Sequence, residues 1–131
     1  MKNSQSELFK KYAWGFFDQN SRLKKLAEGM VDKKIFITGA TGLFGAWVLS
    51  FMDWCHCRKL SAPQITSLVR RDVLPSHSYS KSLIGKLDEF PFPETKFDRL
   101  IHLAAPSARD TFNGMTDRDK LRQLYFGTKN I

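Results

Sequence analysis

Three glycines, each separated from the next by two residues, lie in a stretch that carries no charge between Lys34 and Asp53. They are Gly39, Gly42 and Gly45. Glycine allows a tight reversal of the chain and lets a ligand approach the main chain closely. A helix that begins at such a turn also presents free amides and the positive end of its dipole to an anion. This spacing predicts a site for the diphosphate group of a dinucleotide.

The segments around the glycines must position such a site. Residues 35–37 are β-branched and aromatic and predict a short strand, whereas residues 43–52 predict a buried helix. One membrane-spanning helix is the alternative for this stretch, but the run barely reaches the roughly 20 apolar residues that a span needs. Its glycines also disfavour helix. We therefore expect a strand, a tight bend at Gly39, an approach point for the anion at Gly42, and close helix packing at Gly45.

Two further strands are expected to end beside this turn. Residues 100–105 predict a buried parallel strand, whose terminal alanines allow a flat ligand to lie against the main chain. We expect His102 within it to be a core histidine with its hydrogen bonds satisfied. Residues 65–69 predict a second strand, followed by Arg70. An arginine at this point accepts the 2′-phosphate of NADP, where NAD-selective sites carry a carboxylate. The alternative is that Arg70 is a solvated loop cation.

The segment "TGATGLFG" resembles the Thr-Gly-x-x-Gly-x-x-Gly motif of the short-chain dehydrogenase/reductase superfamily. The resemblance is to its extended members, the NAD(P)-dependent epimerases and dehydratases of nucleotide sugars. Two companions follow in the family's order: "FDRLIHLAAPSA" at 97–108 resembles the fourth strand, and "GTKNI" at 127–131 resembles the Gly-Thr-x-Asn of the next helix. The resemblance implies an α/β, Rossmann-type parallel sheet of strand order 3-2-1-4.

The resemblance also implies a bound cofactor, NADP or NAD, and a nucleotide sugar as substrate. The cofactor contacts that it implies, at the pyrophosphate, the ribose and the nicotinamide ribose in turn, are Gly39, Thr41, Gly42, Leu43, Phe44 and Gly45, then Arg70, then Leu103, Ala104, Ala105 and Pro106. The third strand is expected at residues 81–87, after a connection from the second strand that has room for at most a short helix. Relatives have Gly-Asp-Val or Gly-Asp-Leu at its end, with the Asp at the adenine, but this chain has Gly85, Lys86 and Leu87.

The family's catalytic Ser and Tyr-x-x-x-Lys follow a fifth strand, and we expect residues 31–131 to be an incomplete domain without them. Tyr125 and Lys129 match the spacing but overlap the Gly-Thr-x-Asn segment, so we assign no catalytic residue. The prediction is cofactor binding without turnover by this chain alone. The alternative is a noncatalytic dinucleotide-binding module, or one that recruits a partner.

Residues 1–30 predict two amphipathic helices, with Ser21 capping the second and Gly29 ending it. Their apolar face is expected to pack on the domain or on a second subunit, as in a homodimer. Binding to a membrane surface is the more specific alternative. The apolar positions recur at helical spacing and are Leu8, Phe9, Tyr12, Ala13, Phe16 and Phe17.

Composition and charge limit three other possibilities: nucleic-acid binding, metal binding and secretion. A net charge of +8 and a pI of about 9.7 permit nucleic-acid binding, but the basic residues occur in scattered pairs, so we expect a solvated surface that attracts anionic substrates. Cys55, His56 and Cys57 lack the paired spacing of zinc sites, so free thiols are expected and no metal. No signal peptide is recognisable in "MKNSQSE", which predicts a cytoplasmic protein.

Overall fold

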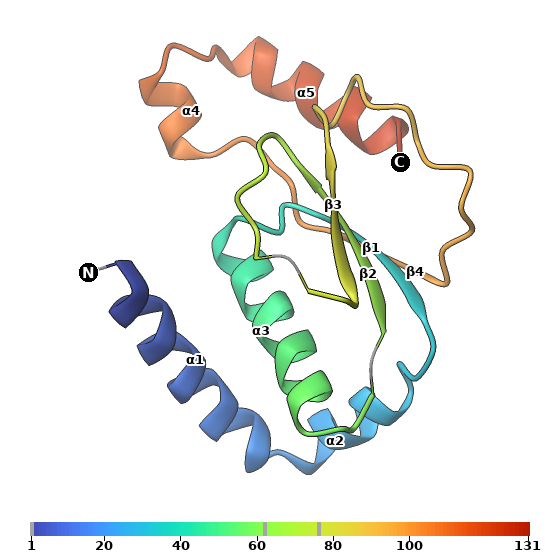
Figure 1. Cartoon of the computed structure of the whole chain (residues 1–131). Coiled ribbons are helices and arrows are strands. Elements are labelled where there is room, and N and C mark those ends of the chain that lie inside the picture. Colours follow the sequence, from blue (N-terminus) through green and yellow to red (C-terminus); the bar gives the residue numbers. More distant parts are fainter. Residues whose placement is uncertain (1, 62, 76) are drawn as a thin grey trace.

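The computed structural model describes residues 2–61, 63–75 and 77–131, with side chains from residue 7 onward. Its centre is a four-stranded parallel sheet with the order β3-β2-β1-β4, which confirms the predicted α/β class and strand order (Figure 1). The strands are β1 (Lys34–Thr38), β2 (Gln64–Val69), β3 (Ser80–Ile84) and β4 (Arg99–His102).

Five helices accompany the sheet in the part of the chain that is described: α1 (Lys2–Asp18), α2 (Ser21–Glu28), α3 (Leu43–Cys57), α4 (Ala108–Phe112) and α5 (Asp117–Lys129). The two predicted N-terminal helices are confirmed, and Gly29 ends the second as expected. The predicted cap is wrong by one residue. The side chain of Asn20, not Ser21, accepts the amides of Arg22 and Leu23, because a capping oxygen must stand one residue before the first helical turn.

Alternation along the strands directs their side chains to two faces. Ile35, Ile37 and Ile65 point to the first face, which α3 covers. Phe36 and Leu68 point to the second face, beneath the segment that joins β3 to β4. Because both faces of this parallel sheet carry large apolar residues, both must be covered by other elements.

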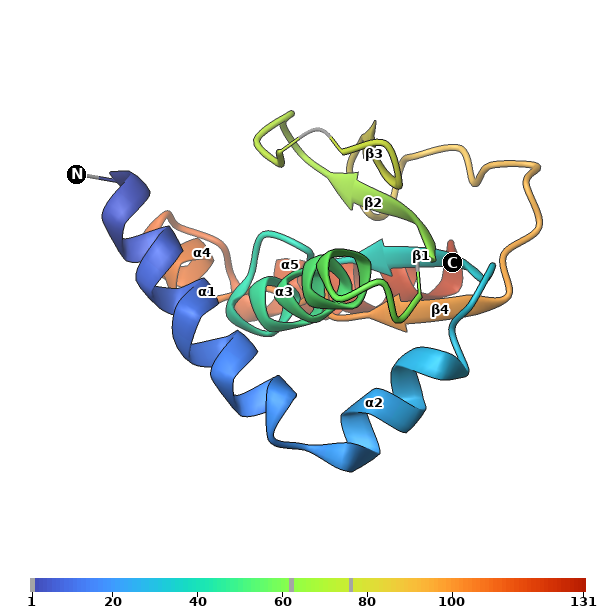
Figure 2. The same cartoon turned by 60° about the horizontal axis from the view of Figure 1, so that its bottom comes forward.

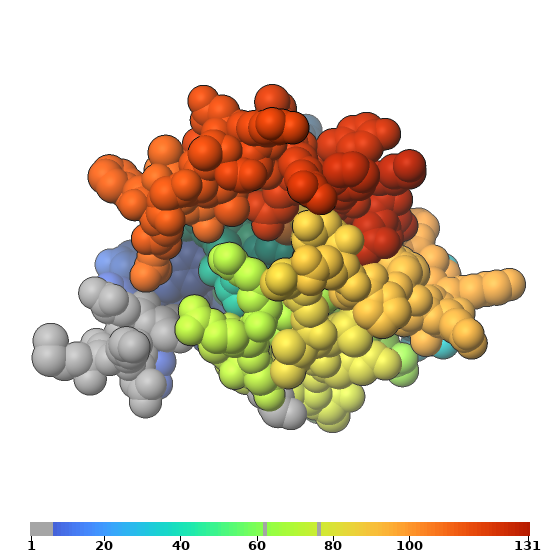
Figure 3. Space-filling view, turned by 90° about the horizontal axis from the view of Figure 1, so that it is seen from above, coloured from blue at the N-terminus to red at the C-terminus, as the bar shows by residue number. Residues whose placement is uncertain are grey.

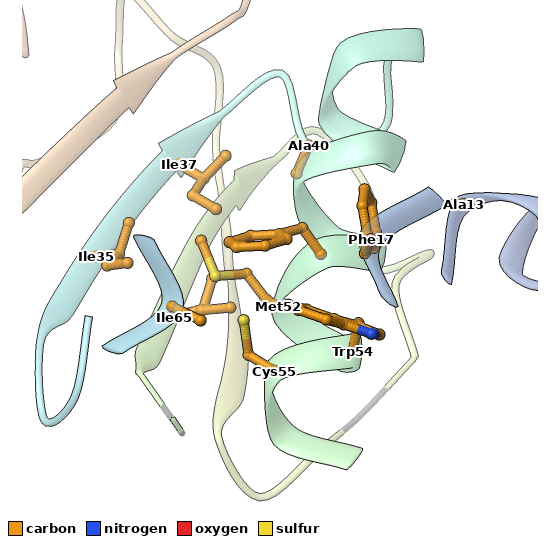
Figure 4. Packing of buried hydrophobic residues seen from close by; sticks show 11 residues of the cluster. Ala13, Phe17, Ile35, Ile37, Ala40, Met52, Trp54, Cys55 and Ile65 are labelled. Atoms are coloured by element: carbon orange, nitrogen blue, oxygen red, sulfur yellow. The ribbon is translucent and has the colours of Figure 1, made fainter. Parts of the chain in front are cut away.

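The first face holds the larger core. Figure 2 shows α1 beside α3, and Figure 4 shows the isoleucines of the sheet directed toward α3, with Phe17 entering from α1. The ring of Phe17 packs edge-on against those of Phe51 and Trp54, with centroids 5.4 and 5.6 Å apart. Polar bonds reinforce the helix pair, since the indole of Trp54 donates to Asp18 at 2.9 Å. The N-terminal helix α1 is therefore part of the domain's core.

The predicted apolar stripe of α1 divides into two. Ala13 and Phe17 are buried in the core, and Phe9 packs edge-on against Trp47 at 5.0 Å. The other three stripe residues are more than half exposed: Leu8, Tyr12 and Phe16. The expectation that the aromatic face packs on the domain holds for the first set only, because neighbouring helix positions point about 100° apart.

The second face is covered by α5 through the Gly-Thr-x-Asn segment. A Cβ at the buried Gly127 would lie 2.5 Å from a methyl of Leu87, so glycine is required for this close approach. The side chain of Asn130 donates to the carbonyls of Leu87 and Phe90 at 3.2 and 3.0 Å. These bonds fasten α5 to the segment that leaves β3.

The connection from β2 to β3 contains no helix in its described residues, 70–75 and 77–79. The third strand lies at the predicted place but covers residues 80–84, so Gly85, Lys86 and Leu87 follow it instead of belonging to it. None of the helices in the described ranges is sufficiently long and apolar to span a bilayer.

Candidate dinucleotide site

The glycine turn, residues 39–45, joins β1 to α3. Gly39 has a φ of +73°, which L side chains rarely adopt. A Cβ here would lie 2.5 Å from the carbonyl carbon of Leu103 and 2.6 Å from the amide nitrogen of Ala104. Glycine therefore permits both the bend and the contact with the chain that leaves β4.

The other two glycines have different surroundings. Gly45 is buried in the first turn of α3, where a Cβ would lie 2.5 Å from the carbonyl oxygen of Ala40 and would also clash with that of Gly39. Gly42, by contrast, is exposed and is the N-cap of α3, with φ −82° and ψ 176°. Its Cβ would meet only the Gly39 carbonyl, at 3.3 Å. The bend and the close packing assigned to Gly39 and Gly45 are thus present, and Gly42 keeps the main chain open to solvent.

The start of α3 carries amides without helical partners. The first helical hydrogen bond runs from the amide of Ala46 to the carbonyl of Gly42, at 2.9 Å. The amides of Leu43, Phe44 and Gly45 come before it and have no acceptor within the helix. The side chains of Leu43 and Phe44 are 72% and 71% exposed. This end of α3 therefore offers donors and the positive end of a helix dipole to an anion.

A chain of hydrogen bonds fixes the end of β4 beside the turn. Thr38 Oγ1 lies 2.6 Å from Nδ1 of His102 and accepts the amide of Ala104 at 3.3 Å. On the other side of the ring, His102 Nε2 lies 3.3 Å from the hydroxyl of Thr128. All these contacts are satisfied when Thr38 donates to Nδ1 and Nε2–H donates to Thr128. Burial lowers the pKa of His102, which favours this neutral form.

His102 is thus the satisfied histidine that the sequence predicted. Both of its ring nitrogens have partners, and these partners join β1, β4 and α5. The bonds position the alanine-rich segment after β4 and leave no free ring nitrogen for acid or base chemistry.

Arg70 leaves β2 at the same edge of the sheet. Its side chain is 76% exposed, and its guanidinium lies 4.0 Å from the carboxylate of Asp110 in α4. Asp110 also accepts bonds from the amide and hydroxyl of Ser107, which close the capping box of α4. These bonds and the charge of Arg70 keep the pKa of Asp110 below its usual range. Arg70 is exposed, as the loop-cation reading required, but it faces a carboxylate.

Figure 3 looks onto the face at the carboxyl ends of the strands. The segment of α4 and α5, in orange and red, lies on one side, and the segment after β2, in green, lies on the other. The teal atoms of the turn and the start of α3 lie deeper between them. The expected diphosphate position is therefore recessed at this face.

The structure brings together only part of the predicted contact set. Gly39 meets Leu103 and Ala104 directly. Thr41 is exposed on the turn, while Ala105 is exposed and Pro106 half-buried on the segment that leads to α4. Which of these residues touch a cofactor stays a prediction.

The end of β3 carries no carboxylate at residues 85–87. A Cβ at Gly85 would lie 2.7 Å from that of Phe90, so glycine allows the following loop to fold back. Lys86 pairs with Glu89 at 3.0 Å on the surface. Neither Gly85 nor Lys86 provides a carboxylate at this end of the strand.

Sequence reasoning missed Asp110, Thr38 and Thr128 as residues that shape the site. The Ser-x-x-Asp pattern at 107–110 is a capping-box signal and indicates a helix start there. Nothing local in the sequence indicates that Thr38 and Thr128 meet across His102, since 90 residues separate them in the chain.

The thiols lie away from this turn, at the end of α3. Cys55 is buried and Cys57 is exposed, and neither forms a disulfide. Burial raises the pKa of Cys55 to about 11, so its thiol is protonated at neutral pH. Among the residues described, no group of three or more His, Cys, Asp or Glu side chains is placed to hold a metal ion.

Comparison of the chain with protein-family models, with curated proteins and with solved structures gave no significant match.

Proposed function

We propose that this chain binds a nicotinamide dinucleotide, with the diphosphate on the glycine turn and the adenosine ribose toward Arg70. One observation carries the proposal: the three glycines surround an open helix start, and each has its own steric environment. Two of them have no room for a side chain, and the exposed one leaves the amides of α3 accessible.

Electrostatics support an anionic ligand at this position. The turn from 39 to 45 contains no charged side chain, so no carboxylate repels a diphosphate there. The start of α3 adds the favourable dipole, and the chain as a whole carries a net charge of +8.

The choice between NADP and NAD rests on Arg70. A guanidinium binds a phosphate through two parallel hydrogen bonds, which favours the 2′-phosphate of NADP. In the structure Asp110 faces this guanidinium, so a 2′-phosphate has to compete with a carboxylate for it. We infer a preference for NADP that Asp110 weakens.

The wider proposal is an oxidoreductase of the epimerase and dehydratase kind that acts on a nucleotide sugar. It rests on the resemblance of the three motifs, and the bound nicotinamide supplies the hydride transfer. In this proposal the described residues contribute the glycine turn and the hydrogen bonds of His102 that fix the end of β4 beside it. We assign no catalytic role to Tyr125, because the motif that it overlaps holds α5 in place through Gly127, Thr128 and Asn130.

Calorimetric titration with NADPH and NADH tests the proposal. Gly42→Asp places a carboxylate at an exposed N-cap, where aspartate suits a helix but repels a diphosphate. We expect it to keep the fold and to weaken binding of both cofactors at least tenfold. Gly15→Asp adds the same charge in α1, where a Cβ meets no atom within 4 Å, and should bind like the unmodified chain.

Failure of the unmodified folded chain to bind either cofactor would overturn the proposal, and so would equal losses in the two variants. Partner recruitment by α1 is the competing function and does not require cofactor binding. The exposed residues Leu8, Tyr12 and Phe16 favour it. Removal of residues 1–30 does not test it, because Ala13 and Phe17 belong to the core.

A further inference from the structure

The outward side of α5 carries an apolar stripe. Its members are Leu121, Leu124 and Tyr125, which are 67%, 38% and 62% exposed. Positions three and four apart lie on one side of a helix, so these side chains form a continuous surface. Together with Thr128 and Lys129 they line a shallow hollow of about 490 Å³. We call the three apolar residues the α5 stripe.

A different side of α5 holds the helix on the domain. Gly127 is buried against Leu87, and the side chain of Asn130 donates to the carbonyls of Leu87 and Phe90. The α5 stripe takes no part in these contacts. It is an apolar surface already in place on a fixed helix, and a partner that covers it removes that surface from water.

Opposite charges stand at equal distances from the middle of the α5 stripe. The stripe is centred on Gln123, and Asp117 precedes this centre by six positions while Lys129 follows it by six. The side chain of Asp117 is 95% exposed, and Lys120 of the same helix pairs with its Oδ1 at 3.1 Å. The other carboxylate oxygen remains for a second cation. Lys129 is exposed as well.

This arrangement is complementary to itself. When two copies of α5 lie antiparallel across a two-fold axis, both copies use the same surface and each contact occurs twice. With the axis at Gln123, Leu121 of one copy meets Tyr125 of the other. Asp117 of one copy then comes level with Lys129 of the other, at both ends of the pair. A parallel pair would place each of these charges beside its own copy, so the charges favour a second copy in the antiparallel orientation.

We propose that this chain forms a homodimer through the α5 stripe, with the two α5 helices antiparallel and an ion pair between Asp117 and Lys129 at each end. Because α5 has 13 residues, the contact strip is about 20 Å long and about 10 Å wide. Standard interfaces bury about 800 Å² on each partner, which is more than this strip provides. We therefore expect a dimer that dissociates on dilution. The proposal is independent of dinucleotide binding.

Analytical ultracentrifugation of the unmodified chain over a hundredfold range of concentration tests the dimer. We expect a reversible equilibrium between monomer and dimer at about 0.15 M salt, where the net charge of +8 on each copy is largely screened. Leu121→Glu places a charge in the α5 stripe and should leave only monomer. Leu8→Glu adds the same charge to α1, at a side chain that is 53% exposed, and should dimerise like the unmodified chain.

An exchange of charges tests the orientation. Asp117→Lys and Lys129→Asp each bring like charges together at both ends of the pair, and each should weaken the dimer about tenfold. The double variant exchanges the two partners and should recover most of that loss, which a purely apolar contact would not do. Glu7→Lys changes the charge by the same amount on the exposed surface of α1 and should have no effect. Urea unfolding checks that each variant keeps its fold.

A chain that stays monomeric at all these concentrations would overturn the proposal. A dimer that survives in Leu121→Glu would do the same, and so would a dimer that is lost in Leu8→Glu, since that result places the interface on α1. The proposal also fails if the double variant dimerises no better than the two single variants.

Discussion

The two faces of the sheet differ in the number of apolar residues that they bury. Among the described residues, the core cluster on the first face has eleven buried members and the cluster on the second face has three. The first face is partly covered by α3 and by α1, and α1 precedes the alternating strands and helices in the chain. On the second face Leu100 of β4 is 50% exposed and Leu121 of α5 is 67% exposed.

The difference shows what the N-terminal helices do for this domain. The connection from β2 to β3 has no helix among its described residues, so part of the first face lacks the layer that a parallel sheet needs. Phe17 and Ala13 of α1 pack against α3 and enlarge that layer. The second face depends instead on a few specific contacts of α5 at Gly127, Thr128 and Asn130.

The largest effect is expected when a large side chain is removed from the core on the first face. Phe17→Ala removes a ring that packs against three other rings of α3, and we expect a loss of about 3 kcal/mol in the free energy of unfolding. Phe16→Ala is the matched control, because its ring is 58% exposed and its loss should stay within about 0.5 kcal/mol. Urea unfolding measures both. Equal losses would show that α1 does not anchor the first face.

A smaller effect is expected on the second face, at acid pH. Burial lowers the pKa of His102 from its ordinary 6.5, so the unfolded chain binds the proton more readily than the folded one. The contribution to stability is present above about pH 6.5 and is lost as pH falls through the folded pKa. Urea unfolding between pH 7.5 and 5 should show this loss in the unmodified chain.

Two variants decide whether His102 causes the acid loss. His102→Gln should flatten the pH dependence, while His56→Gln on the exposed end of α3 should retain it. If the stability of His102→Gln still depended on pH in this range, another group would cause the effect. The hydrogen bonds from Thr38 through His102 to Thr128 would then have no role in the acid loss.

The smallest effect is expected at the carboxyl ends of the strands, where Arg70 faces Asp110. Asp110→Asn removes the charge that faces Arg70 and still offers an oxygen to Ser107. If the chain binds dinucleotides as proposed, the affinity for NADPH relative to NADH should rise a few-fold, since one exposed ion pair contributes about 1 kcal/mol or less. Asp117→Asn on α5, where the side chain is 95% exposed, should leave the ratio unchanged. An unchanged ratio in Asp110→Asn, with both cofactors bound, would remove Arg70 from the ribose site.

Much of the fold was predictable because its signals are local. Residues 35–37 are all apolar, residues 65–69 are β-branched or apolar except for Ser67, and the glycine spacing marks the bend between strand and helix. The cap of α2 was misplaced by one residue, and β3 was placed over 81–87 instead of 80–84, because element ends depend on single hydrogen bonds. The division of the α1 stripe was also missed, since spacing alone does not show which side of an apolar helix meets its partner.

The sequence by itself determined the first two strands and the glycine turn, because these follow from short-range patterns of side-chain size and backbone freedom, whereas the strand order was an expectation from the resemblance of three motifs. Tertiary structure alone decided that Arg70 faces Asp110 and that Thr38 and Thr128 share His102. These features join segments far apart in the chain, and their energies arise only after packing has brought the segments together.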